Sequence, residues 1–369
     1  MSCISENSKE IAVEPSVEKS QDVTRCSLPD KSPALSSRAT HARDLMAPVV
    51  HHVLSEIHSM WRVLGRYANE FDFANLEQSA LASLARIERL IAEGKIEPLV
   101  RIRHSEDSQP LSLTNRELRI GIFPTAADPL HWGHLLGGLI AMEQFRLDKV
   151  LFVIAGLDPR KPDMAPEQVR HSMAKKVIDL FCPLFEYSAI ALGTAASGEE
   201  NLFKILGMNP EQSIHAFYIA GGDHYHRFNP ATGRPDTIQK LEEGIALKRY
   251  GFEGEVHRVS AIFLHREGEE KDIPTTLDVH CVASFPVKTS STEIRSALRD
   301  QHCRRKLYSL PFIELASNLR RLSRRTCRRK SRRTQVLSRS TVIRKHSTSG
   351  GPNEEKAIRF EEDVPKDAE

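Results

Sequence analysis

The spacing of hydrophobic and polar positions changes along the chain, and its first regular part predicts two helices. From Val49 onward, apolar residues recur every three or four positions, which is the spacing of one helix face. They form two sets, the first being Val53, Leu54, Ile57, Trp61 and Leu64, and the second Leu76, Leu81, Leu84, Ile87 and Ile91. Gly94 follows the second set and favours a helix end there. We therefore expect a helical hairpin within residues 45–117.

The next part of the chain alternates strand-like runs with helical spacing. Apolar runs cover Leu118 to Phe123, Val150 to Ala155, Ile214 to Ala220 and Leu277 to Phe285. Helical spacing follows the first run from His134, and its apolar residues are Leu135, Leu136, Leu139, Ile140, Met142 and Phe145. Alternation of this kind is typical of a parallel sheet with crossover helices. We predict an α/β domain with a Rossmann-like parallel sheet over residues 118–322.

Both ends of the chain differ from this pattern. Residues 1–44 are rich in Ser, Glu, Lys and Pro and poor in large apolar groups, so burial cannot repay the entropy of ordering. We expect a disordered head over 1–44 and a disordered tail, basic and then acidic, over 323–369. The part from Arg320 to Lys345 has 12 Lys or Arg and no Asp or Glu, while the whole chain is only +3, which leaves −9 (3 minus 12) elsewhere. Such a tail attracts a polyanion, nucleic acid or an anionic membrane, unless it is simply solvated.

The composition excludes several classes of protein. Hydrophobic residues make up 40% of the 369 residues and no apolar run reaches the length of a membrane span, which is roughly 20 residues. The first 15 residues contain no apolar core of a signal peptide. Six cysteines form no C-x-x-C pair, which indicates reduced thiols in an intracellular protein. We expect a cytoplasmic location, and the basic tail is also compatible with the nucleus.

The chemistry begins where the first predicted strand meets the first helix after it. Asp128-Pro129-Leu130-His131-Trp132-Gly133-His134 occupies this junction. The first turn of a helix presents unpaired N–H groups and the positive end of the helix dipole, which attract phosphate. His131 and His134 are three residues apart and can both donate to such an anion. This pattern predicts a phosphate site, and the competing interpretation is a chance H-x-G-H among 16 histidines.

Three later segments carry groups of the same chemical kind. Lys161 lies in a turn after the second strand, and Gly221-Gly222-Asp223 follows the strand at Ile214. An acid at this place can accept from a ribose hydroxyl or a ring amine. Lys288-Thr289-Ser290-Ser291-Thr292-Glu293-Ile294-Arg295 opens a helix with three hydroxyl residues in a row, a pattern that serves helix capping and phosphate binding equally. Each segment alone also allows a structural interpretation: a solvated lysine, a turn and a cap.

Together these segments resemble the H-x-G-H nucleotidylyltransferases, and within them the nicotinate or nicotinamide mononucleotide adenylyltransferases. Their first motif is usually G-G-x-F-[DN]-P-x-H-x-G-H, and Asp128 to His134 matches its second half. Pro124-Thr125-Ala126-Ala127 stands where the family has Gly-Gly-x-Phe, in a loop that contacts substrate, which makes Thr125 a candidate substrate residue. The family's G-x-D falls on Gly221 and Asp223, and its I-S-S-T-x-I-R matches Ser290 to Arg295. The resemblance covers roughly Leu118 to Leu322.

The resemblance implies adenylyl transfer from ATP to a phosphate acceptor, nicotinate or nicotinamide mononucleotide, with release of pyrophosphate. It makes His131 and His134 the catalytic residues. It assigns Gly221, Asp223, Ser291, Thr292 and Arg295 to ATP binding and Lys161, with Thr125, to the acceptor. A Mg²⁺ ion is expected to bridge phosphate oxygens with few protein ligands. We expect no protein metal site, because neither His51, His52 and His58 nor the residues from Asp223 to His226 form a complete ligand set.

Two other functions stay open at the level of the sequence. Pro124 to His134 also resembles the opening of a tyrosyl-type class I aminoacyl-tRNA synthetase, although only some 70 residues follow Arg295, too few for an anticodon-binding domain. The other alternative is a catalytically degenerate scaffold with this fold, which the altered loop at Pro124 to Ala127 would favour. The sequence specifies neither the acceptor, nor ATP against CTP as donor, nor the oligomeric state.

Overall fold

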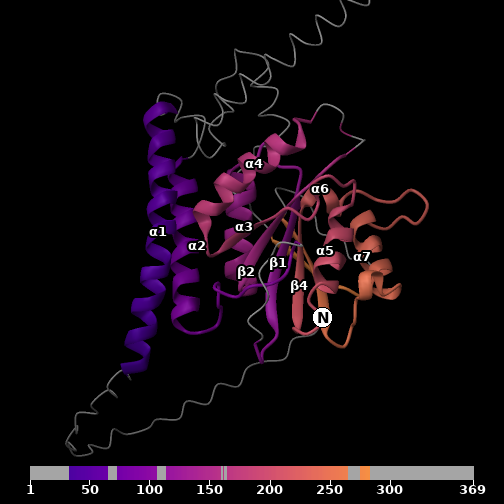
Figure 1. Cartoon of the computed structure of the whole chain (residues 1–369). Coiled ribbons are helices and arrows are strands. Elements are labelled where there is room, and N and C mark those ends of the chain that lie inside the picture. Colours follow the sequence, from indigo (N-terminus) through magenta and orange to yellow (C-terminus); the bar gives the residue numbers. More distant parts are fainter. Residues whose placement is uncertain are drawn as a thin grey trace, which may run out of the picture.

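The protein contains one six-stranded parallel sheet with helices on both faces (Figure 1). The computed structural model describes residues 33–64, 73–105, 114–158, 161, 164–264 and 275–282. The strands are β1 (Leu118–Thr125), β2 (Lys149–Ile154), β3 (Phe185–Ser188), β4 (Ile214–Gly221), β5 (His257–Leu264) and β6 (Asp278–Val282). The predicted α/β fold with a Rossmann-like parallel sheet is confirmed.

The order of the strands reverses direction next to β1. The sheet runs β3-β2-β1-β4-β5-β6, so β1 has β2 on one side and β4 on the other. Ile122 lies opposite Leu151 of β2 and Tyr218 of β4. Ligands of open parallel sheets bind beyond the carboxyl ends of the strands at such a reversal. The topology therefore places a binding crevice beyond Thr125 and Gly221.

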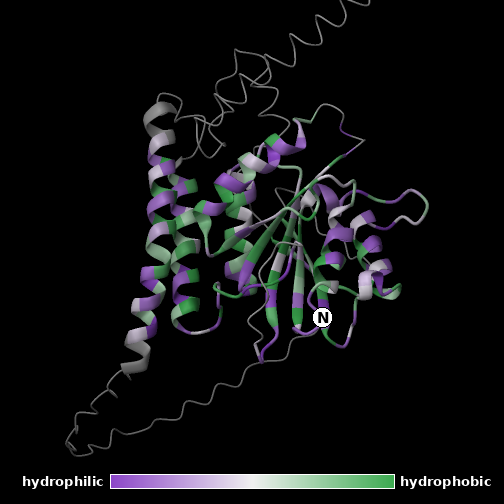
Figure 2. Cartoon of the chain, viewed as in Figure 1, coloured by the Kyte–Doolittle hydropathy of each residue, from purple (hydrophilic) through white to green (hydrophobic). Residues whose placement is uncertain are grey.

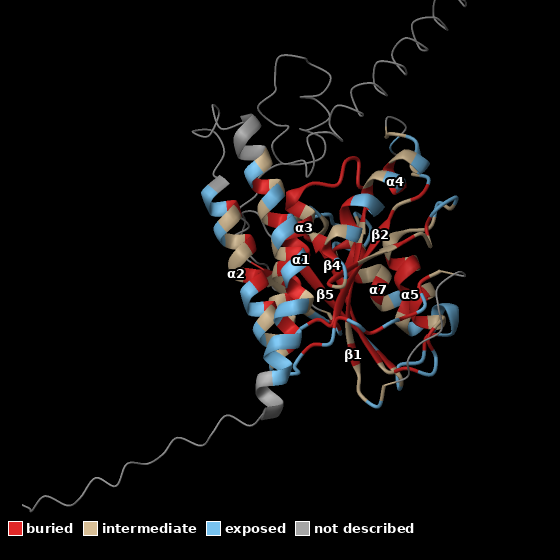
Figure 3. Ribbon diagram, turned by 60° about the vertical axis from the view of Figure 1, so that its left-hand side comes forward, coloured by how far each residue is buried: buried red, intermediate tan, exposed pale blue. Residues whose placement is uncertain are grey.

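Helices bury the two faces of the sheet in separate apolar clusters (Figures 2 and 3). One face carries α3 (Trp132–Phe145) and α4 (Glu167–Ile178) with the 3-10 turn η2 (Asp179–Phe181). The other carries α5 (Gly198–Gly207) and α7 (Asp236–Ala246), with the short α6 (Gly222–Tyr225) and the turn η3 (Arg249–Gly251) nearby. All six residues of β2 are buried, because a strand covered on both faces has no solvent side.

The N-terminal helices pack outside α3, away from the rest of the sheet. They are α1 (Pro33–Leu64) and α2 (Phe73–Ala92), and α2 packs against α3 (Figure 1). The predicted hairpin is thus present, but residues 33–44, which we assigned to a disordered head, are helical. Ala42 is fully buried against the hairpin core. The sequence did not indicate a helix there, because residues 33–44 are mostly small or polar. The buried face of this helix begins with the small Ala42 and continues with Met46.

Some element boundaries differ from those predicted. β1 continues past Phe123 through Pro124 to Thr125, and its last two residues pair with β2 but not with β4. The carbonyl of Thr125 accepts from the N–H of Ala155 on the β2 side, so Pro124 faces the side where pairing has ended and needs no N–H. The short strand β3 and the strand β5 were not identified from the sequence.

Polar groups at the amino ends of the strands hold the opposite edge of the sheet. Asp148, which is fully buried, accepts from the backbone N–H groups of Glu97 and Arg119 and from both terminal nitrogens of Arg116. A carboxylate that accepts four hydrogen bonds is well compensated for its burial. This edge is therefore structural, and the carboxyl ends are left for chemistry.

Some expectations concern residues outside this description. The proposed tail over 323–369, the helix at Ser290 to Arg295 and most of the head lie outside the described residues. Within the described ranges, no helix is both long enough and apolar enough to cross a membrane.

Candidate active site

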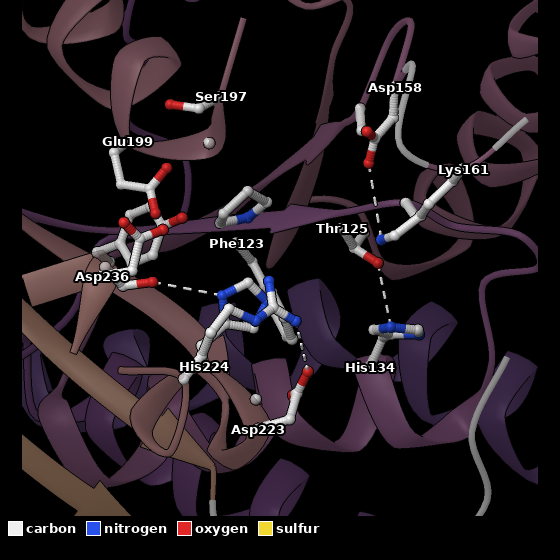
Figure 4. A pocket seen from close by; sticks show the side chains of 18 of the residues that line it. Phe123, Thr125, His134, Asp158, Lys161, Ser197, Glu199, Asp223, His224 and Asp236 are labelled. Carbon is white, nitrogen blue, oxygen red and sulfur yellow. Dashed lines mark hydrogen bonds and ion pairs between the residues drawn. The ribbon is translucent and has the colours of Figure 1, made fainter. Parts of the chain in front are cut away.

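A cleft of about 700 Å³ lies beyond the carboxyl ends of β1, β2 and β4. Its walls come from segments far apart in the chain, which Figure 4 shows converging. Six of the residues predicted from the sequence line it together, namely Thr125, His131, His134, Lys161, Gly221 and Asp223. The place agrees with the reversal of strand order between β1 and β4. Their roles remain predictions, but the fold brings them into one site.

The two histidines form the N-terminal cap of α3. The helix begins at Trp132, two residues before the predicted start, and His131 is its N-cap. Nδ1 of His131 accepts from the N–H of Gly133 at 3.0 Å, and Nδ1 of His134 accepts from the N–H of His131 at 3.4 Å. This is a capping box built from imidazoles. It leaves the Nε2 side of each ring for contacts other than the cap.

His134 is connected to the altered loop through Thr125. Since Nδ1 of His134 accepts from the backbone, a neutral ring carries its proton on Nε2. That atom lies 3.0 Å from Oγ1 of Thr125, which also accepts from the N–H of Ala127 at 3.2 Å. With two donors aimed at its oxygen, the hydroxyl of Thr125 has its own proton to donate. Thr125 lines the cleft, so that donation can go to a bound anion.

Arg170 holds the loops behind this site. It is 3% exposed and donates to four carbonyls: those of Ala165 (3.0 Å), Ala126 (2.6 Å), Ala155 (2.8 Å) and Gly156 (2.6 Å). Burial lowers the pKa of Arg170, while the charge of Asp128 acts to raise it. Arg170 is therefore a buried structural residue rather than a solvated one. The guanidinium ties the loop after β1 to the loop after β2.

Lys161 extends from the loop after β2 into the mouth of the cleft. Its side chain is 57% exposed, and Nζ lies 3.8 Å from the carboxylate of Asp158. A surface ion pair at this distance holds the amine only weakly. Lys161 can therefore turn toward an anion that enters the cleft, as a phosphate-binding residue must.

The Gly-x-Asp segment lies past the end of β4, where it was predicted. Gly221 ends the strand, and Asp223 belongs to the short helix α6. The carboxylate of Asp223 is 73% exposed and lies 3.8 Å from Arg227. Burial lowers the pKa of its neighbour His224, so that ring is neutral at pH 7, and Nδ1 of His224 lies 3.3 Å from the hydroxyl of Thr237. Asp223 has the exposure that an acceptor for a nucleoside hydroxyl or amine requires.

A further wall of the cleft was not found from the sequence. It consists of the N-terminal turns of α5 and α7, and it contains Ser197, Gly198, Glu199, Asp236, Thr237 and Lys240 beside Tyr218 of β4. Burial, and then the charge and the hydrogen bond of Glu199, raise the pKa of Tyr218 well above its usual value, so its hydroxyl is a donor to Glu199. No local motif marks these residues. A Ser before two acids indicates only a helix start.

Three predicted ATP-binding residues cannot be placed. Ser291, Thr292 and Arg295 lie outside the described residues. Within the described part of the chain, no group of three or more His, Cys, Asp or Glu side chains could hold a metal ion. The exposed His51, His52 and His58 lie on α1, away from the sheet.

Comparisons with known proteins lead to one enzyme. No protein-family model matches the chain. A probable nicotinate-nucleotide adenylyltransferase of Thermus thermophilus is 34% identical over 190 residues, which are 50% of this chain and 88% of that protein. A protein of the same name from Clostridium botulinum is 26% identical over 185 residues and 87% of its length. Among solved structures, the Plasmodium falciparum nicotinic acid mononucleotide adenylyltransferase complexed with APC has a TM-score of 0.35 and 14% identity, and it covers 49% of this chain and 84% of that one.

Proposed function

Because the chain belongs to the nicotinate-nucleotide adenylyltransferase family, we propose that it transfers the adenylyl group of ATP to the phosphate of a pyridine mononucleotide. One observation supports this most strongly. The imidazole cap of α3, the hydroxyl of Thr125, Lys161 and the Gly221 to Asp223 segment all line a single cleft. The protein is a nucleotidyltransferase, and the identity of its donor and acceptor is the proposal.

The reaction needs no nucleophilic side chain. An oxygen of the acceptor phosphate forms a bond to the α-phosphorus of ATP, the bond from that phosphorus to the bridging β-oxygen breaks, and pyrophosphate leaves with the electron pair. In-line displacement of this kind requires that two anions be held close together while the developing charge is stabilised. The first turn of α3 offers backbone N–H groups and a dipole for this purpose.

The side chains around α3 have distinct tasks in this proposal. The hydroxyl of Thr125 donates to a phosphate oxygen, and His134 holds that hydroxyl in place through its Nε2 proton. His131 caps the helix and presents its ring in the same cleft. Lys161 binds the incoming phosphate, and Asp223 accepts from the nucleoside of ATP. The predicted phosphate grip of Ser291, Thr292 and Arg295 completes the proposal.

Magnesium is expected to neutralise phosphate charge when bound. Within the described residues, no group of three or more His, Cys, Asp or Glu side chains could hold a metal ion by itself, and Mg²⁺ ordinarily binds to one or two carboxylates together with substrate phosphates and water. Asp223 and Asp158 line the cleft and can contribute single oxygens. The chain's own residues then position the two substrates.

The first prediction is that purified protein releases pyrophosphate from ATP only when a pyridine mononucleotide and Mg²⁺ are both present. The measurement is a coupled pyrophosphate assay with ATP or CTP as donor and with mononucleotides, phosphopantetheine and ribose 5-phosphate as acceptors. Formation of the dinucleotide, detected by mass, is the expected product. Turnover with CTP alone, or with a phosphate acceptor that lacks a pyridine ring, would contradict the proposal. Binding of ATP without turnover on any acceptor would favour the scaffold alternative.

A further inference from the structure

The wall built by α5 and α7 is available to the acceptor. In the proposed function, the first turn of α3 and Thr125 hold the reacting phosphates, and Gly221 and Asp223 bind the nucleoside of ATP. On the opposite side from Thr125 and His134, Figure 4 shows Ser197, Glu199 and Asp236. In the described part of the cleft, this wall is what remains for the part of the acceptor that is not phosphate.

The packing of this wall is tight. A Cβ atom at Gly198 would lie 2.6 Å from Cβ of Pro124 and 2.7 Å from the hydroxyl oxygen of Tyr218. The N-terminus of α5 thus packs directly against Pro124 near the end of β1. Ser197 caps the helix by accepting from the N–H of Glu200 at 3.1 Å. Glu199 lies in the same turn and lines the cleft.

Among the described residues that line the cleft, every charged side chain except that of Glu199 forms an ion pair. The side chains form three ion pairs: Lys161 with Asp158 at 3.8 Å, Arg227 with Asp223 at 3.8 Å, and Lys240 with Asp236 at 2.6 Å. Glu199 forms no ion pair with any residue that the structure describes, and it is 7% exposed. His224, which lies near Glu199, is neutral because burial lowers its pKa. Glu199 therefore gives this wall a net negative charge.

The carboxylate of Glu199 has unused capacity to accept. Among the described residues, it accepts from the hydroxyl of Tyr218, which is 2% exposed and remains protonated. A carboxylate can accept about four hydrogen bonds, and this one lines the cleft. A buried acceptor of this kind favours a ligand that donates and disfavours one that carries its own negative charge.

We propose that Glu199, held by Tyr218, makes the enzyme select a mononucleotide with a ring carboxamide, nicotinamide mononucleotide, over one with a ring carboxylate. This inference rests on the proposed function. The amide NH₂ donates to the carboxylate of Glu199. The carboxylate of nicotinate mononucleotide would instead meet a second negative charge with little water between them. The relatives are named for the nicotinate nucleotide, so this acceptor preference would distinguish the chain from them.

A purely structural role for Glu199 accounts for less. Glu199 and Glu200 both lie in the first turn of α5, where acids stabilise the helix dipole. Glu200 has the same advantage, yet it faces Tyr250 and Lys204, outside the cleft. The dipole explains why acids occur here. It does not explain why one of them is buried against the cleft beside a tyrosine hydroxyl.

The second prediction is therefore a change in acceptor preference. With the full chain, ATP and Mg²⁺, kcat/KM for the carboxamide acceptor should exceed that for the carboxylate acceptor by about 10- to 100-fold. Glu199→Gln removes the charge with little change in shape, and it should lower this ratio by about tenfold or more, mainly through a lower KM for the carboxylate acceptor. Glu200→Gln is the matched control, because it removes an acid from the same helix turn, and it should leave the ratio unchanged.

Titration calorimetry with each mononucleotide provides a second measurement that needs no turnover. Tighter binding of the carboxamide form by the wild type, reduced in Glu199→Gln, supports the inference. A wild-type preference for the carboxylate form would overturn it, as would a ratio that Glu199→Gln does not change or equal binding of both forms. If neither form yields pyrophosphate, the proposed function fails, and the calorimetric preference still decides the role of Glu199.

Discussion

At the scale of single residues, His131 and His134 combine two tasks that are usually separate. Both Nδ1 atoms accept from backbone N–H groups of the first turn of α3, so they stabilise the helix start. Both residues also line the cleft. The altered loop fits this arrangement, because Thr125 supplies the hydroxyl that His134 contacts. We infer that Thr125 is part of the phosphate site rather than a sign of its decay.

The third prediction tests this pair. His134→Gln keeps a side chain that can still accept from the N–H of His131, and Thr125→Val keeps the shape of the threonine without its hydroxyl. Each should lower kcat by roughly 10²- to 10³-fold, as loss of a donor to developing phosphate charge does. The double variant should be little worse than either single one, because the two residues act as a unit.

Steady-state kinetics and thermal melts check this prediction. Thr125→Ser, which keeps the hydroxyl, is the control and should retain most of the activity. Additive losses in the double variant would show that His134 and Thr125 act independently. A loss of kcat that merely follows a lower Tm would assign both residues to the fold.

At the scale of elements, charged side chains of β2 and β3 bind the loop that follows α2 to the sheet. The loop that follows α2 passes beneath β2 and β3, where Nζ of Lys149 donates to the carbonyl of Val100 at 2.6 Å and to Glu186 at 2.7 Å. Nε2 of His104 lies 2.9 Å from the other oxygen of Glu186. Burial alone would raise the pKa of Glu186, but the hydrogen bond of His104 and the charge of Lys149 outweigh it and lower the pKa to about 2.

The fourth prediction concerns the pH dependence of stability that follows from this network. A carboxyl whose pKa falls from its usual 4.5 to about 2 on folding stabilises the fold above pH 4.5, and this contribution is lost as the pH falls toward 2. Glu186→Gln should destabilise the protein at pH 7 by about 2 kcal/mol, a value reduced for the partial exposure of Glu186. The difference from the wild type should shrink as the pH falls from 4.5 to 2.

Urea unfolding at several pH values checks this. Glu211→Gln, at an exposed glutamate outside the network, serves as the control and should have little effect at any pH. A difference between the wild type and Glu186→Gln that does not change between pH 7 and pH 3 would show that the network contributes no proton-linked stability.

At the scale of the whole molecule, the sequence of the catalytic domain is preceded by a helical hairpin and followed by a basic stretch. The hairpin α1–α2 packs on α3 through a mainly apolar contact with the ion pair of Arg86 and Glu143 at its edge. The basic stretch from Arg320 to Lys345 carries 12 positive charges and no acids. It is proposed as a binding segment for a polyanion, while the cleft is formed by the sheet and its loops. The two activities should therefore separate on truncation.

The fifth prediction is that deletion of residues 323–369 leaves adenylyl transfer intact and abolishes binding to nucleic acid. In the full chain that binding should weaken steeply with salt, because each neutralised phosphate releases counterions. The measurements are pyrophosphate assays and fluorescence anisotropy with a labelled oligonucleotide, both at roughly 50 to 300 mM salt. Salt-independent binding, or loss of turnover on truncation, would place the tail in a different role.

What the sequence determined by itself was local. Apolar spacing predicted β1, β2, β4, the helix after β1 and the hairpin, because the periodicity of a strand or helix depends only on residues close together in the sequence. The H-x-G-H and G-x-D segments were also visible, because their function depends on short spacing at a strand end. The hidden parts were those with weak local signals: the four-residue β3, and residues 33–44, whose buried stripe begins with the small Ala42.

Only the tertiary structure decided which distant residues share the cleft. Glu199, Tyr218 and Asp236 come from α5, β4 and α7 and meet because the strand order reverses beside β1. Nothing in the residues next to Arg170 indicates burial, but the fold gives its guanidinium four carbonyls from two loops. Burial and charge pairing depend on contacts between residues distant in sequence, and no local pattern encodes them. Accordingly, the class of reaction was implied by the family resemblance of local motifs, whereas the proposed basis for choosing an acceptor depends on contacts that exist only in the folded chain.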